Sequence, residues 1–128
     1  LAGAHLWPET QIGREISYTM GFYPDLEPRV FLSYERDSWF APESGLRITF
    51  DDVIRFRTEE LTLDSDLWGT ALLEPDQVLM ELKAPGAIPL WMVRLLTEMR
   101  LYKTSFSKYG TAYQLMLEQE VKGVKRYA

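Results

Sequence analysis

The chain has 128 residues, of which 46% are hydrophobic, and it carries a formal net charge of −5. A chain of this length and apolar content is expected to form one folded domain rather than a disordered segment. It has no cysteine, which excludes disulfides and thiolate metal sites, and its acidic balance argues against nucleic acid or an anionic membrane as a partner.

Three further features bound the function. His5 is the single histidine, which excludes a multi-histidine metal site, and we expect it to be a surface residue. No apolar run approaches the roughly 20 residues needed to cross a bilayer, and no signal peptide is evident. We therefore expect a cytoplasmic protein with no membrane insertion by this segment. Because the chain begins at Leu1 and not at methionine, we also expect a fragment of a longer protein.

The first predicted element is a helix from Glu9 to Phe22. Apolar residues recur every four positions along one side of it, at Ile12, Ile16 and Met20. Thr10 is well placed to cap its start, although Gly13 weakens the prediction. Two prolines, Pro24 and Pro28, then predict an extended connector.

Two long strands are predicted next, from Arg29 to Phe40 and from Leu46 to Arg57, with a turn at residues 42–45 between them. Neither face of the first strand is cleanly apolar, so it fits an exposed edge strand and a sheet with a polar face equally well. The second strand alternates over its whole length. Its polar side carries Arg47, Thr49, Asp51, Arg55 and Arg57. Taken alone, such a side is common on solvated antiparallel sheets.

The second half of the chain predicts a further strand and two helices. Residues 58–76 are acidic and irregular, with a short strand around 61–63 or 71–73. The strand at 78–83 places Glu81 and Lys83 on one side. A helix follows from about Pro89 to Leu101, with proline suited to its first position. After a polar and cationic turn at 105–109, a last helix runs from Gly110 to about Val121, with an apolar and aromatic stripe typical of a core.

This order of elements predicts a single α+β domain over residues 1–128, with helices packed on the apolar face of an antiparallel sheet. The other face would gather a surplus of fixed cations with a few carboxylates. Arginine forks and lysine ammonium groups bind linked phosphates, and carboxylates bind a hard divalent ion such as Mn²⁺ or Mg²⁺. The pattern therefore favours a site for phosphate chains with a metal, a combination typical of phosphoryl transfer.

Five short motifs carry a resemblance to a known family. They are YER at 34–36, LRITFDD at 46–52, MELK at 80–83, PLW at 89–91 and SFSKYG at 105–110. From about Ile12 to Tyr113, the chain resembles the C-terminal half of the VTC domain, the polyphosphate polymerase domain of the CYTH-like triphosphate tunnel superfamily. The resemblance implies an antiparallel sheet that forms part of a tunnel-like barrel, with helices packed on the outside.

The resemblance also implies roles for individual residues. Tyr34, Arg36 and Arg47 would line the tunnel wall, and Glu81 would hold the metal with Lys83 beside it. Ser107 and Lys108 would meet the phosphate chain at one end. From strand parity we add three residues to the same wall: Arg55 and Arg57 as phosphate-binding residues, and Asp51 as a second metal ligand.

Several functions stay open at this point. The first is one wall of a metal-dependent polyphosphate polymerase, which transfers a phosphoryl group from ATP to polyphosphate; this chain alone would be incomplete. The second is a binding module for polyphosphate or a nucleoside triphosphate without turnover, and the third is a structural or interaction domain. The family's N-terminal half is missing here, so we expect the partner to be that half-domain or a second copy in a homodimer.

Overall fold

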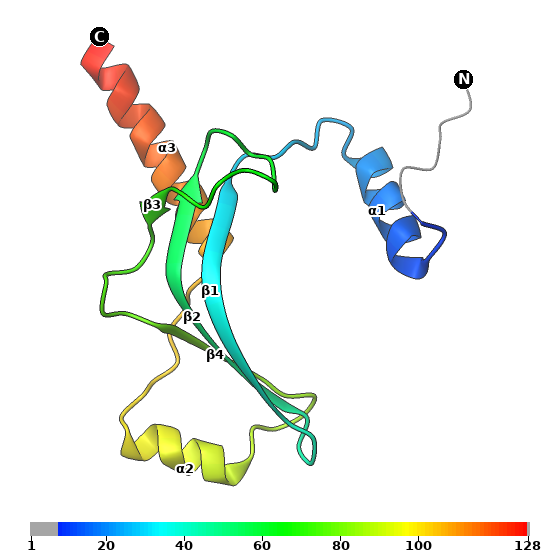
Figure 1. Cartoon of the computed structure of the whole chain (residues 1–128), viewed down its shortest axis with the longest axis vertical. Coiled ribbons are helices and arrows are strands. Elements are labelled where there is room, and N and C mark those ends of the chain that lie inside the picture. The colour runs from blue at the N-terminus through cyan, green and yellow to red at the C-terminus, as the bar shows by residue number, and fades with distance from the viewer. Residues whose placement is uncertain (1–7, 128) are drawn as a thin grey trace.

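The computed structural model describes residues 8–127, and His5 lies outside them. The described residues form three helices and a four-stranded antiparallel sheet, which confirms the α+β class (Figure 1). The strands are β1 (Phe31–Ala41), β2 (Leu46–Arg57), β3 (Thr70–Ala71) and β4 (Leu79–Lys83). β2 is central, because it pairs with β1 along one edge and with both β3 and β4 along the other. Within the described residues the sheet stays open and does not close into a barrel.

A bulge in β2 divides the sheet into two regions. Ser33 pairs with Arg55 and Glu35 pairs with Asp52. Between these two pairs, β1 has one residue and β2 has two, so β2 contains one extra residue. The extra residue is Val53, whose φ of 47° is unusual for a β-branched side chain. Because side chains alternate along a strand, one extra residue reverses which side chains face which way beyond it. Ile54 and Phe56 therefore lie on the same face as Asp51.

The bulge overturns part of the predicted wall. We predicted that Arg55 and Arg57 share a face with Arg47 and Asp51, and this is wrong. Arg55 pairs with Ser33 and Arg57 pairs with Phe31, and these two residues of β1 point away from the face of Arg36. Both arginines therefore lie on the opposite face. The predicted continuous alternation is in fact interrupted at residues 51–54, where two aspartates precede Val53 and Ile54, and the inserted residue lies at this interruption.

Arg57 is instead a structural residue. It is only 4% exposed, and its five N–H groups point at the carbonyl oxygens of residues 59, 60, 66 and 68 and at the hydroxyl of Ser65. Its guanidinium also lies 3.6 Å from the ring centroid of Phe31 and 5.0 Å from that of Trp68. Arg57 thus folds the acidic segment 58–69 against the end of the sheet.

Helix α1 (Gln11–Phe22) forms as predicted, with the Thr10 hydroxyl accepting a hydrogen bond from the Gly13 N–H at 3.1 Å. It lies apart from the sheet at the end of the connector that contains Pro24 and Pro28 (Figure 1). Its predicted apolar stripe is not buried, since Ile12 is 69% exposed.

The other two helices differ in length from their predictions. α2 (Leu90–Glu98) begins after Pro89 and stops short of Leu101, because Arg100 adopts a left-handed φ of 55° that ends the helix. α3 (Lys108–Tyr127) is longer than predicted. No helix in the described residues has the length and apolarity to cross a membrane.

The core lies where α3 meets the sheet. Ala112 and Met116 of α3 pack with Val30 and Phe56, flanked by Leu32, Leu72 and Leu115. Phe56 and Leu32 face the same way as Arg36 and Asp51. Helix α3 therefore packs on the face that carries these charges, and the prediction that the helices pack on the opposite, outer face is wrong for α3.

We expect Arg57→Ala to lower the free energy of unfolding by about 3 kcal/mol, because it leaves several buried carbonyl oxygens without a donor. Arg55→Ala is the matched control: Arg55 is exposed, so its loss should change stability by no more than about 0.5 kcal/mol. Urea unfolding followed by circular dichroism measures both variants. Equal stability of the two would contradict the structural role of Arg57.

Candidate functional site

Strand register gathers the charged residues on one face. Arg36 pairs with Asp51 across β1 and β2, and Thr49, two residues before Asp51, pairs with Glu81 across β2 and β4. Paired residues of antiparallel strands project to the same side. We call this side the charged face; it carries Tyr34, Arg36, Arg47, Asp51, Glu81 and Lys83.

A buried carboxylate lies at the centre of the charged face. Asp51 has a relative exposure of 0%. Arg36 grips it with two parallel hydrogen bonds, from Nε to Oδ1 at 2.5 Å and from Nη2 to Oδ2 at 2.7 Å. Such a two-point contact between a guanidinium and a carboxylate is strong and directional, so it fixes the orientation of the arginine.

Lys108 reaches this carboxylate from the first residue of α3. Its Nζ lies 2.5 Å from Asp51 Oδ2 and 2.7 Å from Glu81 Oε1, so one ammonium joins β2, β4 and α3. The start of α3 is set by Ser107, whose hydroxyl accepts a hydrogen bond from the Gly110 N–H at 3.1 Å. Ser107 was predicted to bind phosphate; in the structure its hydroxyl caps the helix that presents Lys108.

Tyr34 stands beside both cations. The Arg36 guanidinium lies 4.9 Å from the centroid of its ring, and Lys108 Nζ lies 5.0 Å from it. Cations at this range are attracted to the face of an aromatic ring. The tyrosine is 41% exposed, so it also forms the solvent-facing border of the cluster.

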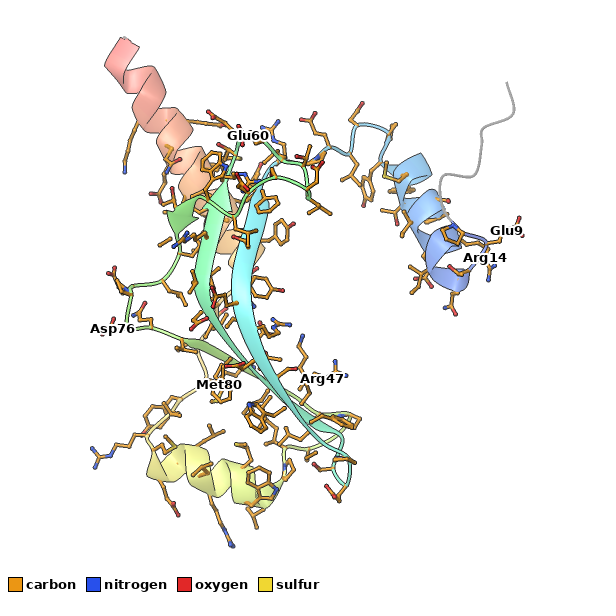
Figure 2. All side chains as sticks on the ribbon, in the orientation of Figure 1. Glu9, Arg14, Arg47, Glu60, Asp76 and Met80 are labelled. Carbon is orange, nitrogen blue, oxygen red and sulfur yellow. The ribbon has the colours of Figure 1, made fainter. Side chains whose placement is uncertain are left out.

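The charged face continues from Asp51 toward the β1–β2 hairpin. Arg47 lies near that end of the sheet (Figure 2) and is paired across the strands with Lys83. Within the described residues Arg47 forms no ion pair, and Lys83 Nζ lies 3.4 Å from Glu81 Oε2. Thr49 pairs with Glu81, and its buried hydroxyl has no hydrogen-bond partner among the described residues.

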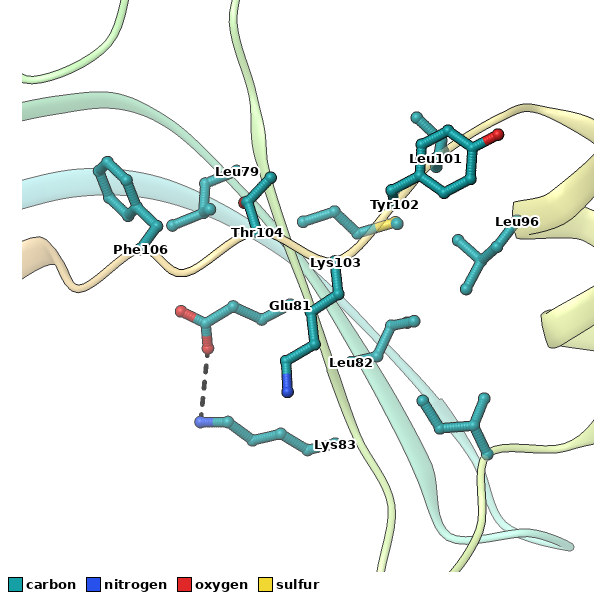
Figure 3. Close-up of a pocket in the computed structure, with 12 residues that line it drawn as sticks. Leu79, Glu81, Leu82, Lys83, Leu96, Leu101, Tyr102, Lys103, Thr104 and Phe106 are labelled. Atoms are coloured by element: carbon teal, nitrogen blue, oxygen red, sulfur yellow. Dashed lines mark ion pairs between the residues drawn. The ribbon is translucent and has the colours of Figure 1, made fainter.

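One cation that sequence reasoning missed lies close by. Lys103, in the segment between α2 and α3, extends toward the pair formed by Glu81 and Lys83 (Figure 3). These three residues line a cavity of about 430 Å³ beside β4, together with apolar side chains such as Leu82 and Leu101. Lys103 lies outside any helix or strand, so no periodicity in the sequence could have placed it.

The cations keep donors for a ligand. Arg36 has five N–H groups and uses two of them on Asp51, and Lys108 has three and uses two on the carboxylates. The side chain of Arg36 is 35% exposed. Together with Lys108 of α3, the charged face presents four cations (Arg36, Arg47, Lys83 and Lys108) and two carboxylates (Asp51 and Glu81), a local charge of +2 in a chain whose net charge is −5. An anionic ligand is therefore favoured here.

The ion pairs shift the ionisation of their members. Hydrogen bonds from Arg36, and next from Lys108, outweigh burial and hold the pKa of Asp51 below its ordinary value. The hydrogen bond from Lys108 likewise lowers the pKa of Glu81. Burial lowers the pKa of Lys108, but its bonds to the two carboxylates together outweigh this and leave the pKa raised. Asp51, Glu81 and Lys108 are thus charged near neutral pH.

Of the two predicted metal ligands, Asp51 and Glu81, only Glu81 is placed where it could bind a metal ion. Both oxygens of Asp51 are occupied by cations and the side chain is fully buried, so it does not fit a metal ligand. No group of three or more His, Asp or Glu side chains in the described residues could hold a metal ion. Glu81 is also paired, through Oε1 with Lys108 and through Oε2 with Lys83 at 3.4 Å, but its side chain is 31% exposed, so a metal ion could reach it. Such an ion would need phosphate and water oxygens for its remaining positions.

We expect the protein to lose stability outside roughly pH 4–10. The pKa of Asp51 is lowered on folding, so its contribution is present above about pH 4 and is lost as the pH falls through its folded pKa. The pKa of Lys108 is raised, so its contribution is lost as the pH rises beyond about 10.5. Urea unfolding over this range measures both. In Asp51→Asn the acid-side loss should be smaller, and an unchanged acid-side loss would contradict this assignment.

Comparison with known proteins bears on this site. A model of the family described as the VTC domain matches residues 8–117, and that region includes the whole sheet and Lys108. Comparisons with curated proteins and with solved structures found no match. The resemblance seen in the motifs is thereby confirmed, and the chain belongs to the VTC domain family.

Proposed function

We propose that this chain is one wall of a polyphosphate-binding site, and that in the intact protein the site transfers phosphoryl groups from ATP to polyphosphate in the presence of a divalent metal. The observation that carries the proposal is the convergence of Arg36 and Lys108 on Asp51, with N–H donors of both cations left over. Membership of the VTC domain family makes phosphate the expected ligand.

The layout of the cations favours a chain of phosphates over a single one. Arg47 and Asp51 are four residues apart on β2 and share a face, a separation of roughly 13 Å along a strand. Arg36 and Lys108 lie at one end of this line, and Lys83 and Arg47 lie at the other. A linear anion can contact both ends at once, whereas one phosphate group reaches only one of them.

The arrangement suits the chemistry of phosphoryl transfer. Charge in that transition state is spread over the oxygens of the transferred group, so catalysis depends on positioning and on fixed positive charge. Arg36 is fixed by its two-point contact and Lys108 by two ion pairs, so neither has to reorganise much as charge develops. Tyr34 would shield one side of both cations from water.

For the metal, we propose Glu81 as the protein ligand. A Mn²⁺ or Mg²⁺ ion held by one carboxylate would neutralise phosphate charge, and it would take its other ligands from phosphate and water. The four surrounding cations disfavour a bare divalent ion at this place. We therefore expect the ion to enter with the phosphate chain.

The open sheet would be completed by further strands. Trp39 and Phe40 near the end of β1 are 67% and 60% exposed, and the outer edge of β1 is unpaired among the described residues. An unpaired edge with exposed aromatic side chains favours pairing with another chain segment. We propose that an N-terminal half-domain or a second copy supplies these strands and closes a tunnel-like barrel over the charged face.

The second candidate function is a binding module that holds polyphosphate or a nucleoside triphosphate without turnover. It is favoured by the limited metal site, since Glu81 is the only accessible carboxylate of the cluster. Incubation of the intact protein with ATP and Mn²⁺, followed by gel analysis of polyphosphate, separates the two. Long-chain product above a no-protein control supports the polymerase, and binding of polyphosphate without product supports the module.

We expect Arg36→Ala and Lys108→Ala each to weaken binding of tripolyphosphate by about 1.5–3 kcal/mol, because each removes a charge-assisted contact. This is roughly a tenfold to 150-fold rise in Kd, measurable by isothermal titration calorimetry. Arg55→Ala, on the opposite face, and Lys122→Ala, farther along α3, are the matched controls and should bind like the wild type. Unchanged affinity in both site variants would remove these residues from the site.

We expect Glu81→Gln to abolish the effect of Mn²⁺ on tripolyphosphate affinity while leaving metal-free affinity largely intact. The amide keeps the size of the side chain but loses the charge that a hard cation needs. Calorimetry with and without Mn²⁺ gives the comparison, and Glu98→Gln on α2 serves as the control. A Mn²⁺ effect that persists in Glu81→Gln would place the metal elsewhere.

A further inference from the structure

We infer that Asp51 is a positioning residue of the proposed phosphate site: it contacts neither phosphate nor metal, and it holds Arg36 and Lys108 in the geometry in which they bind phosphate. This inference rests on the proposed function and names the residue through which the site is preorganised. It replaces the metal-ligand role that the sequence suggested for Asp51.

Burial keeps Asp51 away from any ligand. Its side chain is 0% exposed, and its two oxygens accept three short contacts of 2.5–2.7 Å from the two cations. A phosphate placed against Asp51 would meet negative charge, and a metal would first have to displace Arg36 or Lys108. The side chains of Arg36 and Lys108 are 35% and 12% exposed, whereas that of Asp51 is not exposed at all. A ligand can therefore contact the two cations but not the carboxylate that holds them.

Without Asp51 the two cations would lose their common anchor. Arg36 belongs to β1 and Lys108 to the first turn of α3, so no regular backbone hydrogen bonding relates them. Both are long, flexible side chains of like charge, held near the same tyrosine ring. A carboxylate between them cancels their repulsion and restricts their rotamers before a ligand arrives, and this lowers the entropy lost on binding.

The bulge in β2 makes this arrangement possible. Asp51 must face the same way as Phe56, since Phe56 packs against the helix that presents Lys108. The two positions are five residues apart along β2, and strict alternation would turn them to opposite faces. The extra residue at Val53 restores a common face. The strained backbone there is thus tied to the meeting of Asp51 and Lys108.

The remaining donors show how Asp51 can hold Arg36 without blocking it. The contact uses Nε and Nη2 of Arg36, the edge of the guanidinium nearest Asp51. Both N–H groups of Nη1 are outside this contact, and phosphate oxygens can accept from them. Arg36 can therefore remain bound to Asp51 while it binds phosphate.

The test is a thermodynamic cycle on tripolyphosphate affinity, measured by calorimetry. We expect Asp51→Asn to raise Kd at least tenfold, and the matched control Asp52→Asn, on the next residue and the opposite face, to change it less than twofold. In a protein that already carries Arg36→Ala and Lys108→Ala, Asp51→Asn should have almost no further effect, since its route to the ligand is gone. A loss of equal size in that background would show a merely structural role and overturn the inference.

A second measurement needs no variant. In ¹⁵N NMR spectra of the wild-type protein, the Arg36 Nε–H signal should keep its position when tripolyphosphate is added, while the signals of its Nη groups shift. A large shift of the Nε–H signal would mean that Arg36 leaves Asp51, and it would overturn the inference even if Asp51→Asn fails to fold. If the wild type does not bind tripolyphosphate at all, the proposed function itself fails, and the inference fails with it.

Discussion

The contact between Asp51 and its two cations joins parts of the chain that are far apart in sequence. Arg36 comes from β1 and Lys108 from α3, and Glu81 of β4 is joined to them through Lys108. A buried carboxylate without these partners would be very costly, so the strands and the helix have to meet in one relative position. The same constraint that orders the fold also concentrates positive charge at one place on the sheet.

The single inserted residue in β2 changes which side chains lie on each face of the sheet. Up to Asp51, β2 directs its charges to the charged face; beyond Val53, it directs Ile54 and Phe56 to that face, where α3 packs. The two arginines at the end of the strand then face the other way, and Arg57 donates hydrogen bonds to carbonyl oxygens of the loop that follows. One face thus combines a hydrophobic contact with α3 and an ionic cluster at the start of that helix.

The open side of the molecule matches its charge distribution. The cluster has a surplus of cations and exposed aromatic neighbours, and the sheet that carries it has an unpaired edge at β1. Each feature would be unfavourable in an isolated monomer. Like charges repel, exposed apolar side chains contact water, and an unpaired edge strand tends to associate with other strands. Together they support the proposed polyphosphate site and the proposed pairing with further strands.

Local pattern in the sequence determined the α+β class, the strands β1, β2 and β4, the helix cap at Thr10 and the family, because periodicity and short motifs act over a few residues. It also identified Arg36, Glu81 and Lys108, which do meet. The sequence carries a trace of the bulge at Val53, because two polar and then two apolar residues interrupt the alternation at 51–54, but this interruption does not by itself fix the direction of Arg55 and Arg57. Only the tertiary structure decided that Asp51 is a buried counter-ion, that Arg57 and Ser107 have structural partners, and that α3 packs beside the ion cluster on the same face of the sheet, because each of these depends on the folded chain.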